Sequence, residues 1–451
     1  MAVLDPQGGD GPDTLAVRLS RAVLDRASAV VVASPDEADL AAGVAAALHL
    51  GIPLLVSGPG LEEELDRLGT RTVVRYSSAG TDLGGREVFA GTAVEDLPQL
   101  PGLPRTPSGH GAVALVRDGV TVPPALEPLL AAVGAVTVTV PDADPRASEQ
   151  ARVALRDSAA APVVALGAGF GSDARLAQRV RTSRKADELP GGGLLPFPDR
   201  RMVALYGHPE TAAMGMLGEQ PPARAVERVR RLAGEYAALA DLPVVPAFEL
   251  IATVASGSRQ RDGSYSRRTP VDVLMPYVEA AERAGMYVVL DLQPGRTDFL
   301  AQARHYEELL RRPWVGLALD PEWRLRPGQV HLEQIGSVGI AEVNRVGAWL
   351  AALVRKHDLP PKVLTLHQFR QSMVRDRPRL DTTLDEVQWL VHADGLGTQG
   401  DKQATWTALR AGLPEGVWLG WKNFEDEDSP MLTPAQTMAT VHPAPWFVSY
   451  Q

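Results

Sequence analysis

Two carboxylates stand two residues apart at the end of a predicted buried strand. The segment Gly316-Leu-Ala-Leu-Asp-Pro-Glu-Trp323 predicts a strand that ends in Asp320 and Glu322. Side chains at positions i and i+2 of a strand point in the same direction. In a parallel barrel both acids would project from the C-terminal end, where barrel enzymes carry their chemistry. A carboxylate close to another can stay protonated, as a general acid at neutral pH requires.

Polar side chains recur at the C-terminal ends of the other strands predicted after residue 200. Candidates for a second catalytic carboxylate are Glu249, Asp291 and Asp394. Candidates for substrate binding are Tyr206, His208, Gln293, Arg296, Trp323, His367, Gln368, His392, Lys422 and Asn423. Because each buried ionisable group must be desolvated and paired, such a convergent set favours a functional site over a structural one.

Each residue alone also has a structural explanation. An acid after a strand can cap the next helix, and His367 or His392 can be a satisfied core histidine. Lys422 can merely neutralise a neighbouring carboxylate. A nucleophilic glutamate at the end of the seventh strand is not expected, because Glu425 is out of register with Lys422.

A metal-dependent hydrolase is the competing chemistry. His208, Glu249, His367, His392 and Asp394 could donate to a divalent ion, but no His-x-His or His-Glu-x-x-His spacing is present. We therefore predict no metal.

No organic cofactor is predicted either. The segment Gly167-Ala-Gly-Phe-Gly171 follows a strand, but its spacing differs from a dinucleotide-binding fingerprint and indicates a tight strand-to-helix turn. The absence of cysteine excludes thiol nucleophiles and zinc-thiolate sites, and no Gly-x-Ser-x-Gly elbow suggests a serine nucleophile.

The elements that must position the candidate residues form a predicted C-terminal (β/α)8 TIM barrel over residues 201–451. Its strands are predicted at Met202–Tyr206, Val244–Leu250, Tyr287–Leu292, Val315–Leu319, Lys362–Leu366, Val387–Val391, Val417–Trp421 and Phe447–Tyr450. Helix-length segments follow most of them, and the length matches the roughly 250 residues of such barrels. A Pro- and Gly-rich linker over residues 189–200 precedes the barrel.

Residues 1–188 predict a separate Rossmann-like parallel α/β domain. Apolar strands are predicted at Ala29–Ala33, Pro53–Val56, Thr72–Val74, Ala112–Val116, Ala135–Val140 and Pro162–Leu166, with helices at Glu37–Leu50 and Ala147–Ser158. Strands that alternate with helices imply parallel pairing through crossover connections. A Pro- and Gly-rich stretch, Gly91–Gly111, divides these strands into two groups.

The bulk composition is that of a globular protein, with 45% hydrophobic and 22% charged residues among 451. A net charge of -10 argues against a nucleic-acid partner, because phosphate binding needs a basic face. No apolar run is long enough to predict a transmembrane segment, and the N-terminus lacks the pattern of a signal peptide.

Two resemblances add expectations about location and activity. The segments Val30–Val56 and Val163–Leu176 resemble cell wall-binding repeat type 2 of Gram-positive surface proteins. Most of the chain, including Asp291–Arg296, Leu319–Trp323 and Gly420–Phe424, resembles an actinobacterial family of envelope-associated proteins that carry such a segment. This resemblance implies an extracellular or envelope-associated protein, whose signal or lipid-anchor segment is missing from this sequence, with an envelope polysaccharide as partner.

The Asp-x-Glu motif resembles that of chitinase-like and lysozyme-like barrel glycosidases. For this sequence the resemblance implies that Glu322 protonates the leaving oxygen and that Asp320 is its partner. We therefore predict a glycoside hydrolase acting on a cell-envelope glycan by carboxylate acid/base catalysis. The alternatives are a non-catalytic glycan-binding protein and a metal-dependent hydrolase on the same barrel. The sugar, the linkage, the stereochemical course and the oligomeric state stay open.

Overall fold

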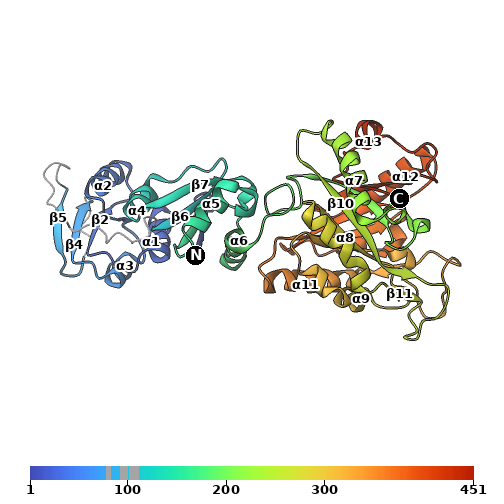
Figure 1. Ribbon diagram of the computed structural model, residues 1–451. Coiled ribbons are helices and arrows are strands. Elements are labelled where there is room, and N and C mark those ends of the chain that lie inside the picture. The colour runs from blue at the N-terminus through green and yellow to red at the C-terminus, as the bar shows by residue number, and fades with distance from the viewer. Residues whose placement is uncertain (78–82, 92–99, 101–110) are drawn as a thin grey trace. The chain divides into compact units, whose positions relative to one another are not determined.

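The computed structural model describes residues 1–77, 83–91, 100 and 111–451, and the chain divides into two compact units, Met1–Lys185 and Ala186–Gln451 (Figure 1). Most of the predicted Pro- and Gly-rich stretch Gly91–Gly111 lies outside the described residues. Each unit has its own strands, helices and apolar core.

Among its described residues, the first unit contains two four-stranded parallel sheets. One has the order β1 (Ala2–Leu4), β8 (Val163–Leu166), β6 (Ala112–Arg117) and β7 (Ala135–Val140), and the other has the order β3 (Leu54–Val56), β2 (Ala29–Ala33), β4 (Thr72–Tyr76) and β5 (Glu87–Ala90). The helices are α1 (Pro12–Val23), α2 (Glu37–Leu50), α3 (Leu61–Leu68), α4 (Glu127–Ala132), α5 (Glu149–Asp157) and α6 (Asp173–Lys185). The six predicted strands all form, and the two groups predicted on either side of Gly91–Gly111 lie in separate sheets. A Rossmann-like domain is not confirmed.

The glycine-rich segment after β8 forms a tight turn into α6. Gly167, Gly169 and Gly171 have φ angles of 115°, 97° and 79°, a region that side chains with a Cβ rarely adopt. The glycines are therefore required by the backbone conformation of this connection.

Eight parallel strands close into a barrel within Ala186–Gln451, all of which the structure describes. Their order is β9 (Arg201–Gly207), β10 (Val244–Ala255), β12 (Tyr287–Leu292), β13 (Val315–Leu319), β15 (Lys362–Gln368), β17 (Val387–Ala393), β18 (Trp418–Asn423) and β19 (Phe447–Tyr450). The pairing of β19 with β9 closes the barrel. The predicted parallel barrel is thus confirmed, in a form compatible with a TIM barrel.

Helices lie outside the barrel strands (Figure 1). They are α7 (Pro222–Ala237), α8 (Val271–Arg283), α9 (Phe299–His305), α10 (Glu307–Leu310), α11 (Ile340–Lys356), α12 (Gln399–Arg410) and α13 (Pro434–Thr440). The connection from β15 to β17, fully described, has short 3-10 turns and β16 (Val374–Arg375) in place of an α-helix. β16 pairs with β14 (Val338–Gly339), and β11 (Ser266–Arg268) adds an antiparallel strand to β10. The barrel therefore departs from a regular (β/α)8 pattern.

The apolar core of the barrel includes part of the linker. Leu189 and Phe197 are buried in one cluster with Met202, Val245 and Phe447, which lie at the N-terminal ends of their strands. The linker therefore closes this end of the barrel, and the opposite end is left for polar residues.

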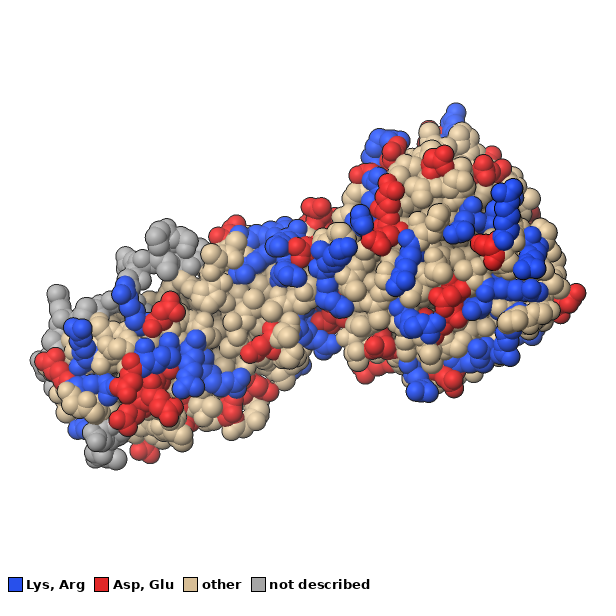
Figure 2. All heavy atoms as spheres, turned by 90° about the horizontal axis from the view of Figure 1, so that it is seen from below, with Lys and Arg blue, Asp and Glu red and all other residues tan. Residues whose placement is uncertain are grey.

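Charged side chains of both signs are interspersed on the face shown in Figure 2, so neither sign forms a continuous field there. Among the residues that the structure describes, no helix combines the length and apolarity needed to cross a membrane.

Candidate active site

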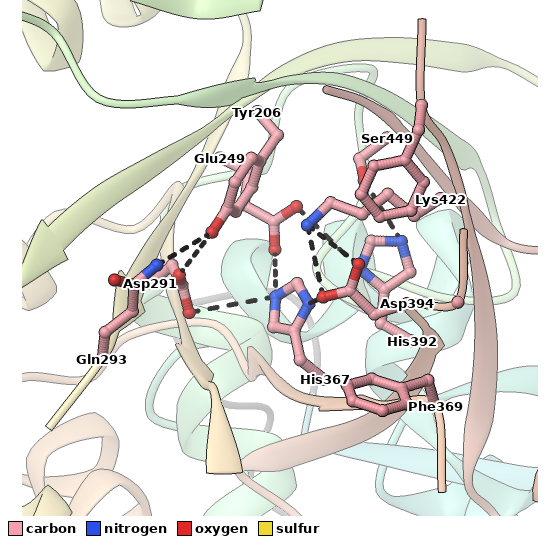
Figure 3. A network of polar contacts seen from close by, with 12 residues as sticks. Tyr206, Glu249, Asp291, Gln293, His367, Phe369, His392, Asp394, Lys422 and Ser449 are labelled. Carbon is pink, nitrogen blue, oxygen red and sulfur yellow. Dashed lines mark hydrogen bonds and ion pairs between the residues drawn. The ribbon is translucent and has the colours of Figure 1, made fainter. Parts of the chain in front are cut away.

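The polar cluster sits at the C-terminal ends of the barrel strands because strand register brings its members to similar levels. Glu249 of β10 pairs with Tyr206 of β9, and His367 of β15 pairs with His392 of β17. Lys422 of β18 pairs with Ser449 of β19. Figure 3 shows these side chains pointing toward one another from different strands. The structure therefore brings together residues that the sequence places up to about 240 positions apart.

His367 lies between two carboxylates. Its Nε2 is 2.8 Å from Glu249 Oε1, and its Nδ1 is 2.9 Å from Asp394 Oδ2 (Figure 3). Burial opposes a charge on the ring, but Glu249 and Asp394 hold the pKa of His367 well above its usual value. Burial also opposes ionisation of Glu249, yet His367 holds the pKa of this carboxyl below its usual value. The histidine is therefore a cation shared by two anions.

Asp394 is an ionised carboxylate despite its burial. Lys422 Nζ lies 3.1 Å from Asp394 Oδ1 and 3.5 Å from the centre of the Tyr206 ring. Burial opposes the charge of Asp394, but Lys422 and the bond to His367 hold its pKa well below the usual value. With Glu249 and Asp394 negative and His367 and Lys422 positive, the four charges balance.

Asp291 lies in the same cluster but is the weaker acid. Tyr206 donates its hydroxyl to Asp291 Oδ2 at 3.0 Å, and the Gln293 amide lies 3.4 Å from the same hydroxyl. Burial raises the pKa of Asp291 to about 6, against the opposing influence of His367. Its other oxygen, Oδ1, is buried with no hydrogen-bond partner.

Asp320 and Glu322 follow β13 and line a cavity of about 540 Å³. Burial and then the charge of Asp291 raise the pKa of Asp320 well above its usual range. Burial and then the charge of Asp394 raise the pKa of Glu322 to about 7. Glu322 is partly exposed, whereas Asp320 is buried. The partly exposed carboxyl is thus a proton donor at neutral pH that a ligand in the cavity can reach.

The cavity wall contains about half of the residues singled out from the sequence. Those that line it are Tyr206, Gln293, Asp320, Glu322, Trp323, Asp394 and Lys422. Lining residues that were not predicted are Phe369, Arg370, Gly395, Leu396, Thr405, Phe424 and Gln451. Most of these directly follow a barrel strand, which is a signal the sequence contains, but Thr405 lies on α12 and has no such signal.

Six predicted binding residues do not line the cavity, and four of them, outside the histidine pair His367 and His392, are held by other partners. His208 lies 2.9 Å from the Thr269 hydroxyl, and the Arg296 guanidinium stacks 4.0 Å from the centre of the Tyr265 ring. Gln368 accepts a hydrogen bond from Arg377, and Asn423 accepts one from Trp421. These residues are held by the protein itself.

Glu249, His367 and His392 are a group whose ligand atoms could hold a metal ion. All three are buried, and they are absent from the residues that line the cavity. They lie beneath it, with Asp394 and Lys422 at the cavity wall.

Comparison with models of protein families gave no match to this chain, and comparison with curated proteins gave none either.

Proposed function

We propose that the barrel unit is a glycoside hydrolase that uses carboxylate acid/base catalysis on a cell-envelope glycan. The observation that carries the proposal is that two carboxyl groups with pKa values shifted in opposite directions, Glu322 upward and Asp394 downward, line one cavity. A proton donor on the leaving oxygen and an ionised carboxylate near the anomeric carbon are what glycoside cleavage requires.

In this proposal Glu322 donates its proton to the departing glycosidic oxygen. Asp394, fixed by Lys422 and His367, stabilises the positive charge that develops on the sugar or activates the attacking water. Glu249 and Asp291, also expected as second carboxylates, are fully buried and do not line the cavity. In this proposal Glu249 positions His367 and favours its charged form, and Asp291 positions Tyr206 by accepting its hydroxyl.

Asp320 is the partner of Glu322 in the cavity. Asp320 lines the cavity, and its raised pKa keeps a proton on the carboxyl. A substrate hydroxyl or amide can therefore pair with this group. Asp320, Glu322 and Asp394 together give the cavity wall three carboxyl groups.

Aromatic rings provide the second support for a sugar ligand. Trp323, Phe369 and Phe424 line the same cavity. Apolar faces of pyranose rings pack against such side chains, while hydroxyl groups hydrogen-bond to polar groups between them.

A metal-dependent mechanism has less support, because Glu249, His367 and His392 do not line the cavity. A catalytic ion needs an open coordination position on the substrate side.

The envelope location rests on the resemblance of the first unit to wall-binding repeats. We propose that Met1–Lys185 is a Rossmann-like α/β unit that binds wall polymer and thereby brings the barrel to its substrate.

The test is the release of reducing ends from actinobacterial wall fractions, namely peptidoglycan, arabinogalactan and mannan. Wild type, Glu322→Gln and the control Glu227→Gln are compared, the last altering an exposed carboxylate on α7. We expect release by wild type and control, and a loss of at least about 100-fold in Glu322→Gln with retained binding to the same fraction. Binding to a fraction without release by any of the three proteins would instead support a non-catalytic glycan-binding protein.

A further inference from the structure

A buried group of potential metal-ligand atoms lies beneath the cavity. The group consists of Glu249, His367 and His392, whose ligand atoms all lie within 4.8 Å of one another. His367 Nε2 is 2.8 Å from Glu249 Oε1, and His392 Nδ1 is 3.9 Å from Glu249 Oε2. Around a tetrahedral ion with bonds of roughly 2.1 Å, neighbouring ligand atoms lie about 3.4 Å apart. The two distances in this group lie on either side of that value.

Three atoms of this region are buried without a hydrogen-bond partner. They are Glu249 Oε2, His392 Nδ1 and Asp291 Oδ1, and the last lies 3.9 Å from His367 Nε2. A buried polar atom left without a partner destabilises the folded state, so three such atoms together call for an explanation. Because all three can be electron-pair donors, a shared cation satisfies them at once.

The outer nitrogens of both histidines are already held. His367 Nδ1 lies 2.9 Å from Asp394 Oδ2, and His392 Nε2 lies 3.2 Å from the Ser449 hydroxyl (Figure 3). Metal-binding histidines usually donate their second ring nitrogen to a carboxylate or another oxygen in this way, which turns the first nitrogen toward the ion. Asp291 is similarly fixed, since Tyr206 donates to its Oδ2.

We propose that Glu249, His367 and His392, with Asp291 Oδ1 beside them, bind a single divalent transition-metal ion in the interior of the barrel. Two imidazole nitrogens with carboxylate oxygens favour Zn²⁺ over Ca²⁺ or Mg²⁺, which prefer oxygen ligands alone. The ion takes the place of the proton between His367 and Glu249.

The role of this ion is structural. Its ligands are fully buried and are not among the residues lining the cavity. The ion holds His367 and Asp291 in place, and these side chains bond to Asp394 and Tyr206 of the cavity wall. This proposal goes beyond the glycosidase proposal and does not depend on it, because Glu322 is not among the ligands.

The experiment measures metal content and affinity in the full chain. The protein is treated with dipicolinate, incubated with Zn²⁺, passed through a desalting column and analysed by mass spectrometry for metal. Titration with Co²⁺ adds an absorption spectrum that reports the coordination geometry. We expect a single tightly held Zn²⁺ per chain in wild type and a tetrahedral Co²⁺ spectrum.

Three variants locate the ion. His392→Ala should lose the bound Zn²⁺, whereas His305→Ala, which removes an exposed imidazole on α9, should keep it. Ser449→Ala removes only the hydrogen bond to His392 Nε2, so it should fold normally and weaken Zn²⁺ binding by about 10- to 100-fold. This variant keeps the proposal testable if His392→Ala does not fold.

The outcomes separate the two proposals. Glu322→Gln should retain Zn²⁺ even where it loses hydrolysis. Wild-type protein without stoichiometric Zn²⁺ after incubation, or His392→Ala and Ser449→Ala with wild-type affinity, would overturn the metal site and leave the glycosidase proposal untouched.

Discussion

Replacement of Lys422 by Met should destabilise the barrel unit strongly, because it leaves a buried anion with one partner fewer. Lys422 Nζ is 3.1 Å from Asp394 Oδ1, and the two side chains are 2% and 11% exposed. At this distance and an effective dielectric constant of about 20, the attraction amounts to about 5 kcal/mol. Breaking a buried pair by removal of one partner typically costs about 3–5 kcal/mol, and we expect a loss in this range.

The assay is urea unfolding followed by tryptophan fluorescence. All eight tryptophans lie between Trp314 and Trp446, so the signal reports the barrel unit alone. The matched control is Lys356→Met, which alters an exposed lysine on α11 and should change the unfolding free energy by less than about 0.5 kcal/mol.

A double-mutant cycle isolates the pair. In Lys422→Met with Asp394→Asn, neither charge remains, so the loss should be smaller than the sum of the two single losses by about 2 kcal/mol or more. A loss below 1 kcal/mol in Lys422→Met, or additive losses in the double variant, would refute the reasoning that Asp394 is an ionised, buried group.

Three further predictions concern Glu322 and its neighbour Trp323. In the proposed mechanism the protonated Glu322 carboxyl is the active form, and its pKa is raised to about 7, so kcat/KM should fall about tenfold per pH unit above about pH 7. A decline that already begins near pH 4.5 would contradict this. In the folded state Glu322 keeps its proton up to about pH 7, whereas in the unfolded chain the carboxyl loses it above about pH 4.5. The protonated carboxyl therefore contributes fully to the free energy of unfolding below about pH 4.5, and this contribution is lost as pH rises through about 7. Glu322→Gln, which cannot ionise, should therefore have a higher Tm than wild type at pH 8 and a similar Tm at pH 4.5, with the reverse order at pH 8 counting against the raised pKa. Trp323→Leu should raise KM by roughly 2- to 10-fold with little change in kcat, since ring stacking is worth about 0.5–1.5 kcal/mol; an equal fall in kcat would show that Trp323 acts in the transition state.

The sequence was sufficient to predict the parallel barrel because each strand carries a short apolar run before a polar end. Asp291 at the end of β12 and His392 near the end of β17 illustrate this pattern. A position at a strand end also fixes the side of the barrel on which a residue lies, which is why Glu322 and Asp394 could be assigned to one region.

Protonation states could not be predicted, because they depend on distances across the barrel. Asp291 and Asp394 have equivalent positions in the sequence pattern, yet the pKa of Asp291 is raised and that of Asp394 is lowered. The difference arises because Asp394 has Lys422 and His367 as hydrogen-bonded partners, whereas Asp291 has the neutral hydroxyl of Tyr206.

The sequence also missed weakly patterned elements. The strand β5 (Glu87–Ala90) has only four residues and is mostly exposed, so its short apolar segment does not stand out in the sequence as a buried strand, although it pairs with β4. Residues His208 and Arg296 lie at strand ends as expected, but their side chains bind Thr269 and Gln329 and do not reach the cavity.

The role of Glu322 as proton donor is tested most directly by aryl and alkyl glycosides that share one sugar and differ in leaving group. Wild type and Glu322→Gln are assayed on each substrate. If Glu322 protonates the leaving oxygen, the variant should lose roughly 100-fold or more on an alkyl glycoside and little on a 2,4-dinitrophenyl glycoside, whose leaving group needs no proton. An equal loss on every substrate would contradict the account, because Glu322 would then contribute to binding or folding and not to proton transfer.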